Sequence, residues 1–175
     1  MKNARLKLVA VAVAAIGVVG MGTAAVASGN HDREHLTGYE EVPALSTPGA
    51  GDFRIDIHKA SIDYTLTFSG LESDAQQAHI HFENATNNGP VVVFLCSNLG
   101  NGPAGTQACP TGGGTITGTI TAANVGGGAA AQGLAAGEFD EFVQALRSGA
   151  TYVNVHSTNR PTGEIRAQIN NDDDD

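Results

Sequence analysis

Alternation of apolar and polar side chains is the feature that most constrains the fold of this chain. Between residues 61 and 70 every second side chain is apolar, at Ile62, Tyr64, Leu66 and Phe68. Residues 53–57 alternate in the same way. A strict period of two is typical of a β-strand with one buried face, and the short Lys59-Ala60 link between the two segments predicts a β-hairpin.

Six further segments carry strand signals, and turn-forming residues separate them. We expect strands at residues 36–42, 77–82, 90–96, 115–121, 151–156 and 164–169. Residues 138–147 instead place apolar side chains at helical spacing, which predicts one short amphipathic helix. A high share of glycine, 23 of 175 residues, agrees with a fold rich in strands and turns. The sequence therefore predicts an all-β protein, an antiparallel sandwich or Greek-key barrel of about eight strands with one short helix.

The first 27 residues have the three parts of a secretory signal peptide. These are the cations Lys2, Arg5 and Lys7, an apolar run over residues 8–20, and the small-residue cleavage site Ala25-Val26-Ala27. The alternative is an uncleaved membrane anchor, because residues 8–26 are just long enough to span a bilayer. We favour cleavage after Ala27, which predicts a secreted or periplasmic protein without stable membrane insertion.

The remaining chain divides into three parts. We expect a flexible polar segment at 28–35, one domain at 36–170 and a solvated acidic tail at 171–175. Cleavage removes three cations and no anions, so the formal net charge falls from −9 to −12. An acidic chain with few cations cannot neutralise a phosphate backbone, and nucleic acid is therefore excluded as a partner.

Cys96 and Cys109 are the only cysteines. An exported chain enters an oxidising compartment, and the twelve residues between them are rich in turn formers. We expect a structural disulfide that closes this loop and contributes about 2–4 kcal/mol to stability.

Three histidines are the strongest candidates for chemistry. His79 and His81 are separated by one residue of a predicted strand, so their side chains share one face. His156 alternates with Val153 and Val155, and we expect all three histidines on outward strand faces. Imidazoles from rigid strands suit Cu, Zn and Ni. The alternative is that they hydrogen-bond to the backbone and hold loops in place; the sequence alone leaves both interpretations open.

Three blocks of the chain resemble the CHRD (chordin-type) domain family. These are LTGYEEVPALSTPGAG, AHIHFENATNNGPVVVFLC and GATYVNVHSTNRPTGEIRAQI, which occur in the family's order and extend over residues 36–169. The resemblance implies a secreted protein with an immunoglobulin-like β-barrel and limited similarity to copper-zinc superoxide dismutase. The chain has one copy of the domain and none of chordin's cysteine-rich modules, so a growth-factor-binding role does not carry over.

The dismutase analogy assigns roles to four residues. His79, His81 and His156 match strand-borne copper ligands, and Arg166 matches an anion-guiding arginine. An ion pair of Arg166 with Glu164, two residues away on the same strand face, is the simpler expectation. No histidine lies between His81 and His156, so the zinc ligands of the dismutase are missing.

No residue pattern indicates an enzyme. No serine lies in a nucleophile-elbow motif, and Glu40 and Glu41 would point to opposite faces of a strand. We therefore expect a non-enzymatic binding module that holds one copper ion and meets a protein or glycan partner. The alternatives are a degenerate dismutase-like metalloenzyme and a structural or adhesive protein of the cell envelope.

Overall fold

Eight antiparallel strands form one continuous sheet in the computed structural model, which describes residues 31–170. The strands are β1 (His31–Thr37), β2 (Ala50–Ile57), β3 (Ile62–Ser69), β4 (Ala75–Phe82), β5 (Val91–Ser97), β6 (Gly114–Ile120), β7 (Thr151–Ser157) and β8 (Ile165–Ile169). Their order in the sheet is β5-β4-β7-β8-β1-β2-β3-β6. The predicted fold class, a mostly β sandwich or barrel with one short helix, is confirmed.

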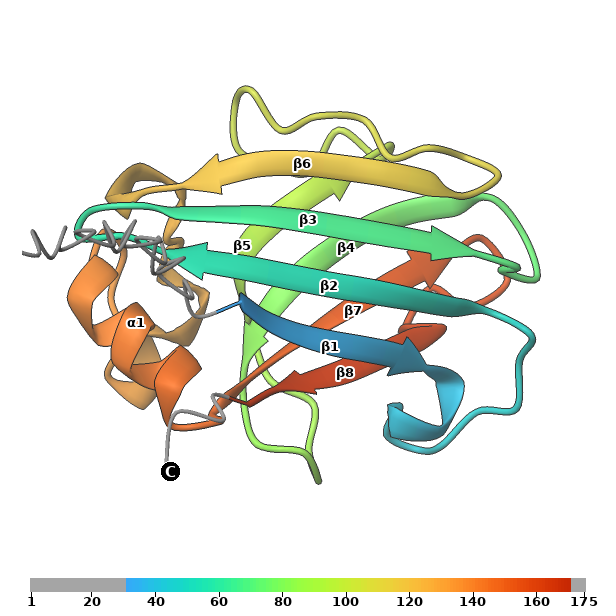
Figure 1. Cartoon of the computed structure of the whole chain (residues 1–175), viewed down its shortest axis with the longest axis horizontal. Helices are drawn as coiled ribbons and strands as arrows, with labels where there is room; N and C mark the ends of the chain where they lie inside the picture. The colour runs from blue at the N-terminus through green and yellow to red at the C-terminus, as the bar shows by residue number, and fades with distance from the viewer. Residues whose placement is uncertain (1–30, 171–175) are drawn as a thin grey trace, which may run out of the picture.

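The sheet folds over on itself where β8 meets β1. These two strands share a single residue pair, Thr37 with Arg166, whereas β2 and β3 pair along their whole length. The fold therefore has two layers of four strands, and β5, β4 and β7 cross behind β6, β3 and β2 (Figure 1). Alternation along both layers sends aliphatic and aromatic side chains into the shared core, including Ile80, Val153, Phe53 and Leu66.

A side chain bridges the two free edges, β5 and β6. The Gln107 amide donates hydrogen bonds to the carbonyl oxygen of Leu95 on β5 and to that of Thr117 on β6. The Tyr64 hydroxyl, from β3, also donates to the Leu95 carbonyl oxygen. β5 and β6 do not pair as strands, and these hydrogen bonds link them instead, so the barrel is nearly closed.

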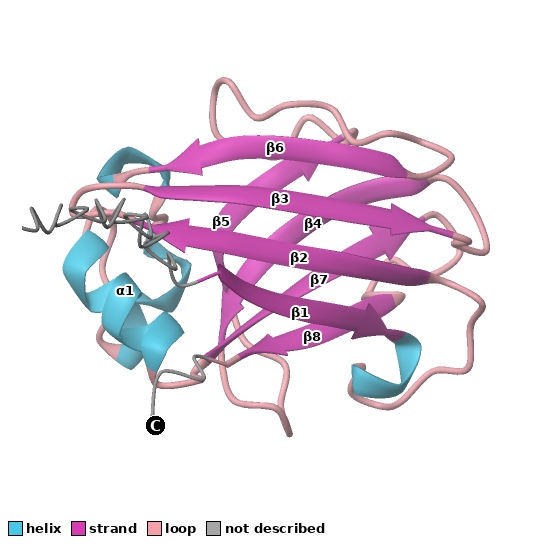
Figure 2. Cartoon of the chain, viewed as in Figure 1, coloured by secondary structure: helices cyan, strands magenta, loops and turns pink. Residues whose placement is uncertain are grey.

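The predicted helix is α1 (Phe139–Arg147), which covers one end of the sandwich together with two short 3₁₀ turns (Figure 2). Phe142 and Leu146 are among its buried side chains. Acidic residues lie in its first turn and Arg147 lies in its last turn, an arrangement that interacts favourably with the helix macrodipole.

The first strand differs from the prediction. Residues 36–42 were expected to be extended, but β1 ends at Thr37 and a 3₁₀ turn follows at Gly38–Glu40. The Glu41 amide closes the turn by donating to the Gly38 carbonyl oxygen at 3.2 Å, and the Leu45 amide donates to the same oxygen at 2.7 Å. The strand starts earlier because polar residues expected to be flexible pair with β2, and Arg33 bonds Asp52 across the strands.

The remaining expectations concern the disulfide and the chain ends. Cys96 and Cys109 form the predicted disulfide, which joins the end of β5 to the loop before β6. The expected signal peptide, residues 1–27, and the acidic tail, residues 171–175, lie outside the described residues. Within residues 31–170 no helix has the length and apolar character needed to cross a membrane.

Candidate metal centre

The outer face of the β4, β7 and β8 strands carries a buried layer of polar side chains. Its members are His79, His81, Tyr152, Asn154, His156, Glu164, Arg166 and Gln168, each at most 8% exposed. Alternation placed the three histidines on the correct face, but the expectation that this face is exposed was wrong. The face is buried because two loops, residues 83–90 and 157–163, lie over it and bond to its side chains.

The first covering loop, residues 83–90, is held by the polar layer itself. Arg166 donates to the Asn88 side-chain oxygen and to the Asn84 carbonyl oxygen, at 3.2 and 3.1 Å. Gln168 donates to the Glu83 carbonyl oxygen at 3.0 Å. The Gly89 amide donates to the Tyr152 hydroxyl oxygen at 3.1 Å. These bonds use side chains that would otherwise be buried without partners, so layer and loop stabilise each other.

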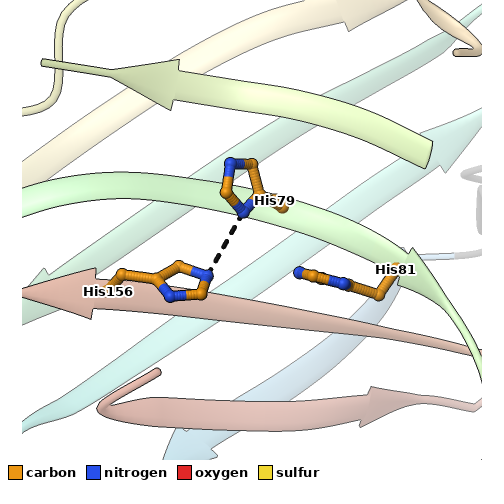
Figure 3. A group of neighbouring side chains, drawn as sticks. All are labelled: His79, His81 and His156. Carbon is orange, nitrogen blue, oxygen red and sulfur yellow. Dashed lines mark hydrogen bonds between the residues drawn. The ribbon is translucent and has the colours of Figure 1, made fainter. Parts of the chain in front are cut away.

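The three histidines converge beneath this cover. One nitrogen of each ring lies within 4.8 Å of the others, and Figure 3 shows a nitrogen of each ring turned toward the same small space. The shortest separation is 3.2 Å, between His79 Nδ1 and His156 Nε2. The convergence follows from strand pairing, because β4 and β7 are adjacent and His79 pairs with Asn154, two residues from His156.

Backbone carbonyls fix the orientation of two of the rings. His81 Nδ1 donates to the Gly89 carbonyl oxygen at 2.8 Å, and His156 Nδ1 donates to the Pro161 carbonyl oxygen at 3.0 Å. Each Nδ1 therefore carries the proton, which leaves a lone pair on Nε2. His81 Nε2 is buried and has no hydrogen-bond partner among the described residues. Such fixed rings are typical of metal-ligating histidines, and these three residues fit a metal ion.

Burial keeps the imidazoles neutral. It lowers the pKa of His79 to about 3, and the neighbouring His156 and His81 lower it further. Burial also lowers the pKa of His156 to about 4, against the hydrogen bond to Pro161. The pKa of His81 is lowered as well, mainly by burial. Neutral imidazole is the form that binds a metal, so the cluster needs no deprotonation near pH 7.

Arg166 belongs to a stack that reaches the histidines. Its guanidinium carbon lies 3.5 Å from the centre of the Tyr152 ring, and that ring stacks on His81 with centres 4.6 Å apart and planes 5° apart. The side chain is 0% exposed. The anion-guiding role implied by the resemblance needs contact with solvent, and this burial does not fit it.

The expected ion pair of Arg166 with Glu164 was also wrong. The Glu164 carboxylate instead accepts hydrogen bonds from the Thr47 and Ser157 hydroxyls and from the Glu72 amide. Arg166 is committed to the covering loop and to Tyr152. The two side chains lie two residues apart on one strand face, but they hydrogen-bond to different loops.

A comparison with protein families identifies the domain. The model of the CHRD domain matches residues 33–169. The chain belongs to the CHRD-domain family. Neither a curated protein nor a solved structure matches the chain. CHRD is an extracellular-type domain, and the Cys96–Cys109 disulfide agrees with that type.

Sequence reasoning overlooked one ionisable residue near the polar layer of this CHRD domain. Glu41 is 7% exposed, and its Oε1 has no hydrogen-bond partner among the described residues. Burial raises the pKa of Glu41 to about 7, although Arg166 acts in the opposite direction. Gly163 makes room for this carboxyl, because a Cβ there would lie 2.5 Å from Oε1. The only signal in the sequence was the Glu40-Glu41 pair, and the turn that buries one of them was not predicted.

Proposed function

We propose that this CHRD domain is an exported, non-enzymatic binding module that holds one copper ion through His79, His81 and His156. The observation that carries the proposal is the convergence of three ring nitrogens within 4.8 Å in a buried site. Structural histidines in the alternative interpretation would each satisfy their ring nitrogens with protein groups, and His81 Nε2, which faces the site, has no partner among the described residues.

The ligand geometry favours a transition metal. Metal–imidazole bonds of about 2.0–2.1 Å put two ligand nitrogens about 3.3–3.6 Å apart. The 3.2 Å between His79 Nδ1 and His156 Nε2 is close to this separation, and the His81 ring nitrogen, within 4.8 Å of both, completes the site by moving closer to them. Three imidazoles without a carboxylate suit copper and do not suit Mg²⁺ or Ca²⁺.

Burial favours retention of the ion over turnover of a substrate. His81 Nε2 is buried, and the loop at 83–90 is bonded to the polar layer beneath it. Across residues 31–170, the histidine trio is the one group of three or more His, Cys, Asp or Glu residues that could hold a metal. These observations support a single-metal module over a dismutase-like enzyme. The disulfide and the leader-like first 27 residues support export, and the partner we propose is an extracellular protein or glycan.

Metal content after export tests the proposal. The exported protein, a His79→Ala/His156→Ala variant and a His58→Ala control are exposed to copper and to zinc, dialysed and analysed by elemental mass spectrometry. His58 is a suitable control because it lies exposed on the opposite layer beside Asp63. We expect about one copper per chain in the wild type and the control, and little in the double variant. Equal, substoichiometric copper in all three would overturn the proposal and favour a structural or adhesive role.

A further inference from the structure

We propose that the histidine site binds Cu(I) more tightly than Cu(II), and that Arg166, acting through Tyr152, contributes to this preference. The inference rests on the proposed function, because it concerns the oxidation state of the ion that His79, His81 and His156 would hold. Three properties of the site support it: the charge of its ligands, its burial and the position of Arg166.

The ligands supply no negative charge. All three are imidazoles, and no carboxylate contributes to the pKa of any of them. The side chain next to them, Asn154, is a neutral amide whose oxygen lies 3.0 Å from His156 Nε2. The full charge of a bound ion is therefore not offset by its ligands.

Burial penalises a dication more than a monocation. The cost of moving an ion out of water rises with the square of its charge, so a divalent ion loses about four times as much hydration free energy. Cu(II) also prefers a tetragonal arrangement with additional ligands, whereas Cu(I) is stable with three. This buried site, which includes His79 and His81, offers three ring nitrogens as ligands, the number with which Cu(I) is stable.

Arg166 adds a fixed positive charge. Tyr152 lies on the central strand of three, between His81 on β4 and Arg166 on β8. The stacked separations of 3.5 and 4.6 Å put the guanidinium within about 8 Å of the His81 ring. Its hydrogen bonds to Asn88 and Asn84 prevent it from turning toward solvent. Repulsion from this charge is twice as large for Cu(II) as for Cu(I).

Two variants and a control test the inference. Arg166→Met removes the charge and keeps an apolar stem. Asn154→Asp adds a negative charge beside His156 with almost no change in size. Arg54→Met makes the same change in net charge at an exposed position of β2. Dissociation constants for Cu(I), under anaerobic reducing conditions, and for Cu(II) are measured at pH 7.5 by competition with chelators of known affinity.

We expect the wild type and Arg54→Met to bind Cu(I) more tightly than Cu(II). Arg166→Met should reduce the ratio of the two affinities about thirtyfold, taking the ion to lie about as far from the guanidinium as the His81 ring does, about 8 Å, at an effective dielectric constant near 20. This corresponds to a fall of about 90 mV in the potential of the one-electron couple. Asn154→Asp should reduce the ratio further, because its charge is closer, and it decides the charge argument if Arg166→Met does not fold.

The outcomes separate the two proposals. If the wild type retains copper in neither oxidation state, the proposed function fails and the inference fails with it. If it retains copper but binds Cu(II) at least as tightly as Cu(I), only the inference is overturned. An unchanged ratio in both charge variants would show that Arg166 does not contribute.

Discussion

The outer face of the β5-β4-β7-β8 layer is covered by loops, whereas the outer face of the β1-β2-β3-β6 layer is open to solvent. Both layers carry histidines, in β1 and directly after β2 on the open side and in β4 and β7 on the covered side. On the open face, His35 and His58 are 65% and 47% exposed and lie beside the carboxylates of Asp52 and Asp63. On the covered face, His79 is 2% exposed and its nearest polar partner is another imidazole.

The difference teaches that the cover, more than the strand, determines the chemistry of a histidine. A solvated imidazole beside a carboxylate forms a surface pair that contributes little to stability. A buried imidazole among others stays neutral and leaves its lone pair available to a metal. The loop that creates the second environment is held by Arg166, Gln168 and Tyr152, which lie in the same polar layer as the histidines.

The largest expected effect is loss of stability in acid when the protein is free of metal. The pKa values of His79 and His156, about 3 and about 4, lie below the ordinary value of 6.5. Above pH 6.5 neither the folded nor the unfolded chain binds these protons, and the histidines have no effect on the pH dependence. As the pH falls below 6.5 the unfolded chain takes them up first, so stability falls by about 1.4 kcal/mol per histidine per pH unit. Between pH 6.5 and 4.5 the two histidines together should cost about 5 kcal/mol.

Urea unfolding at a series of pH values, with a chelator present, measures this loss. A His79→Gln/His156→Gln variant should show a flatter pH profile, and His58→Gln, on the open face, should follow the wild type. Parallel profiles for all three proteins would mean that the covered histidines are solvated like the exposed ones.

The second expected effect concerns the cover. Arg166→Ala removes the bonds to Asn88 and Asn84 and the stack on Tyr152, and it leaves a cavity among buried polar groups. We expect a loss of about 3–5 kcal/mol in the free energy of unfolding. Arg54→Ala, on the open face, should change it by less than about 0.5 kcal/mol. Faster hydrogen exchange at the Gly89 amide in the Arg166 variant would localise the loss to the loop, and similar stabilities of the two variants would contradict the role given to Arg166.

Much of this comparison was accessible from the sequence. Strand signals in the sequence predicted the positions of seven of the eight strands, and the local period of two predicted the shared face of the histidines. The first strand was misplaced because β1 is polar, with Leu36 its one aliphatic core residue, and long-range pairing with β2 stabilises it. The burial of the histidines could not be predicted, because it depends on where the loops at 83–90 and 157–163 fold back. Those loops are polar and contain several asparagines. A loop of that composition can lie exposed to solvent as readily as it can fold back and hydrogen-bond to the polar layer, as these two do.

The smallest expected effect compares two adjacent residues, Glu41 and Glu40, of which the first is buried and the second exposed. The pKa of Glu41 is raised from 4.5 to about 7 by burial, so folding favours its protonated form. Below pH 4.5 the carboxyl is protonated in both states and has no cost. Between pH 4.5 and 7 the unfolded chain releases this proton while the folded chain holds it, so stability falls over this range; above pH 7 the folded chain carries the ionised carboxylate without a hydrogen bond on Oε1. Glu41→Gln removes that cost and should stabilise the protein by about 1–3 kcal/mol at pH 8, with little gain at pH 4.5, whereas Glu40→Gln should change neither value.

Urea unfolding at the two pH values measures the difference. Destabilisation by Glu41→Gln at pH 8 would show that the attraction of the ionised carboxylate to Arg166 outweighs its burial, and the polar layer would then extend from the histidines, through Tyr152 and Arg166, to a buried ion pair at Glu41.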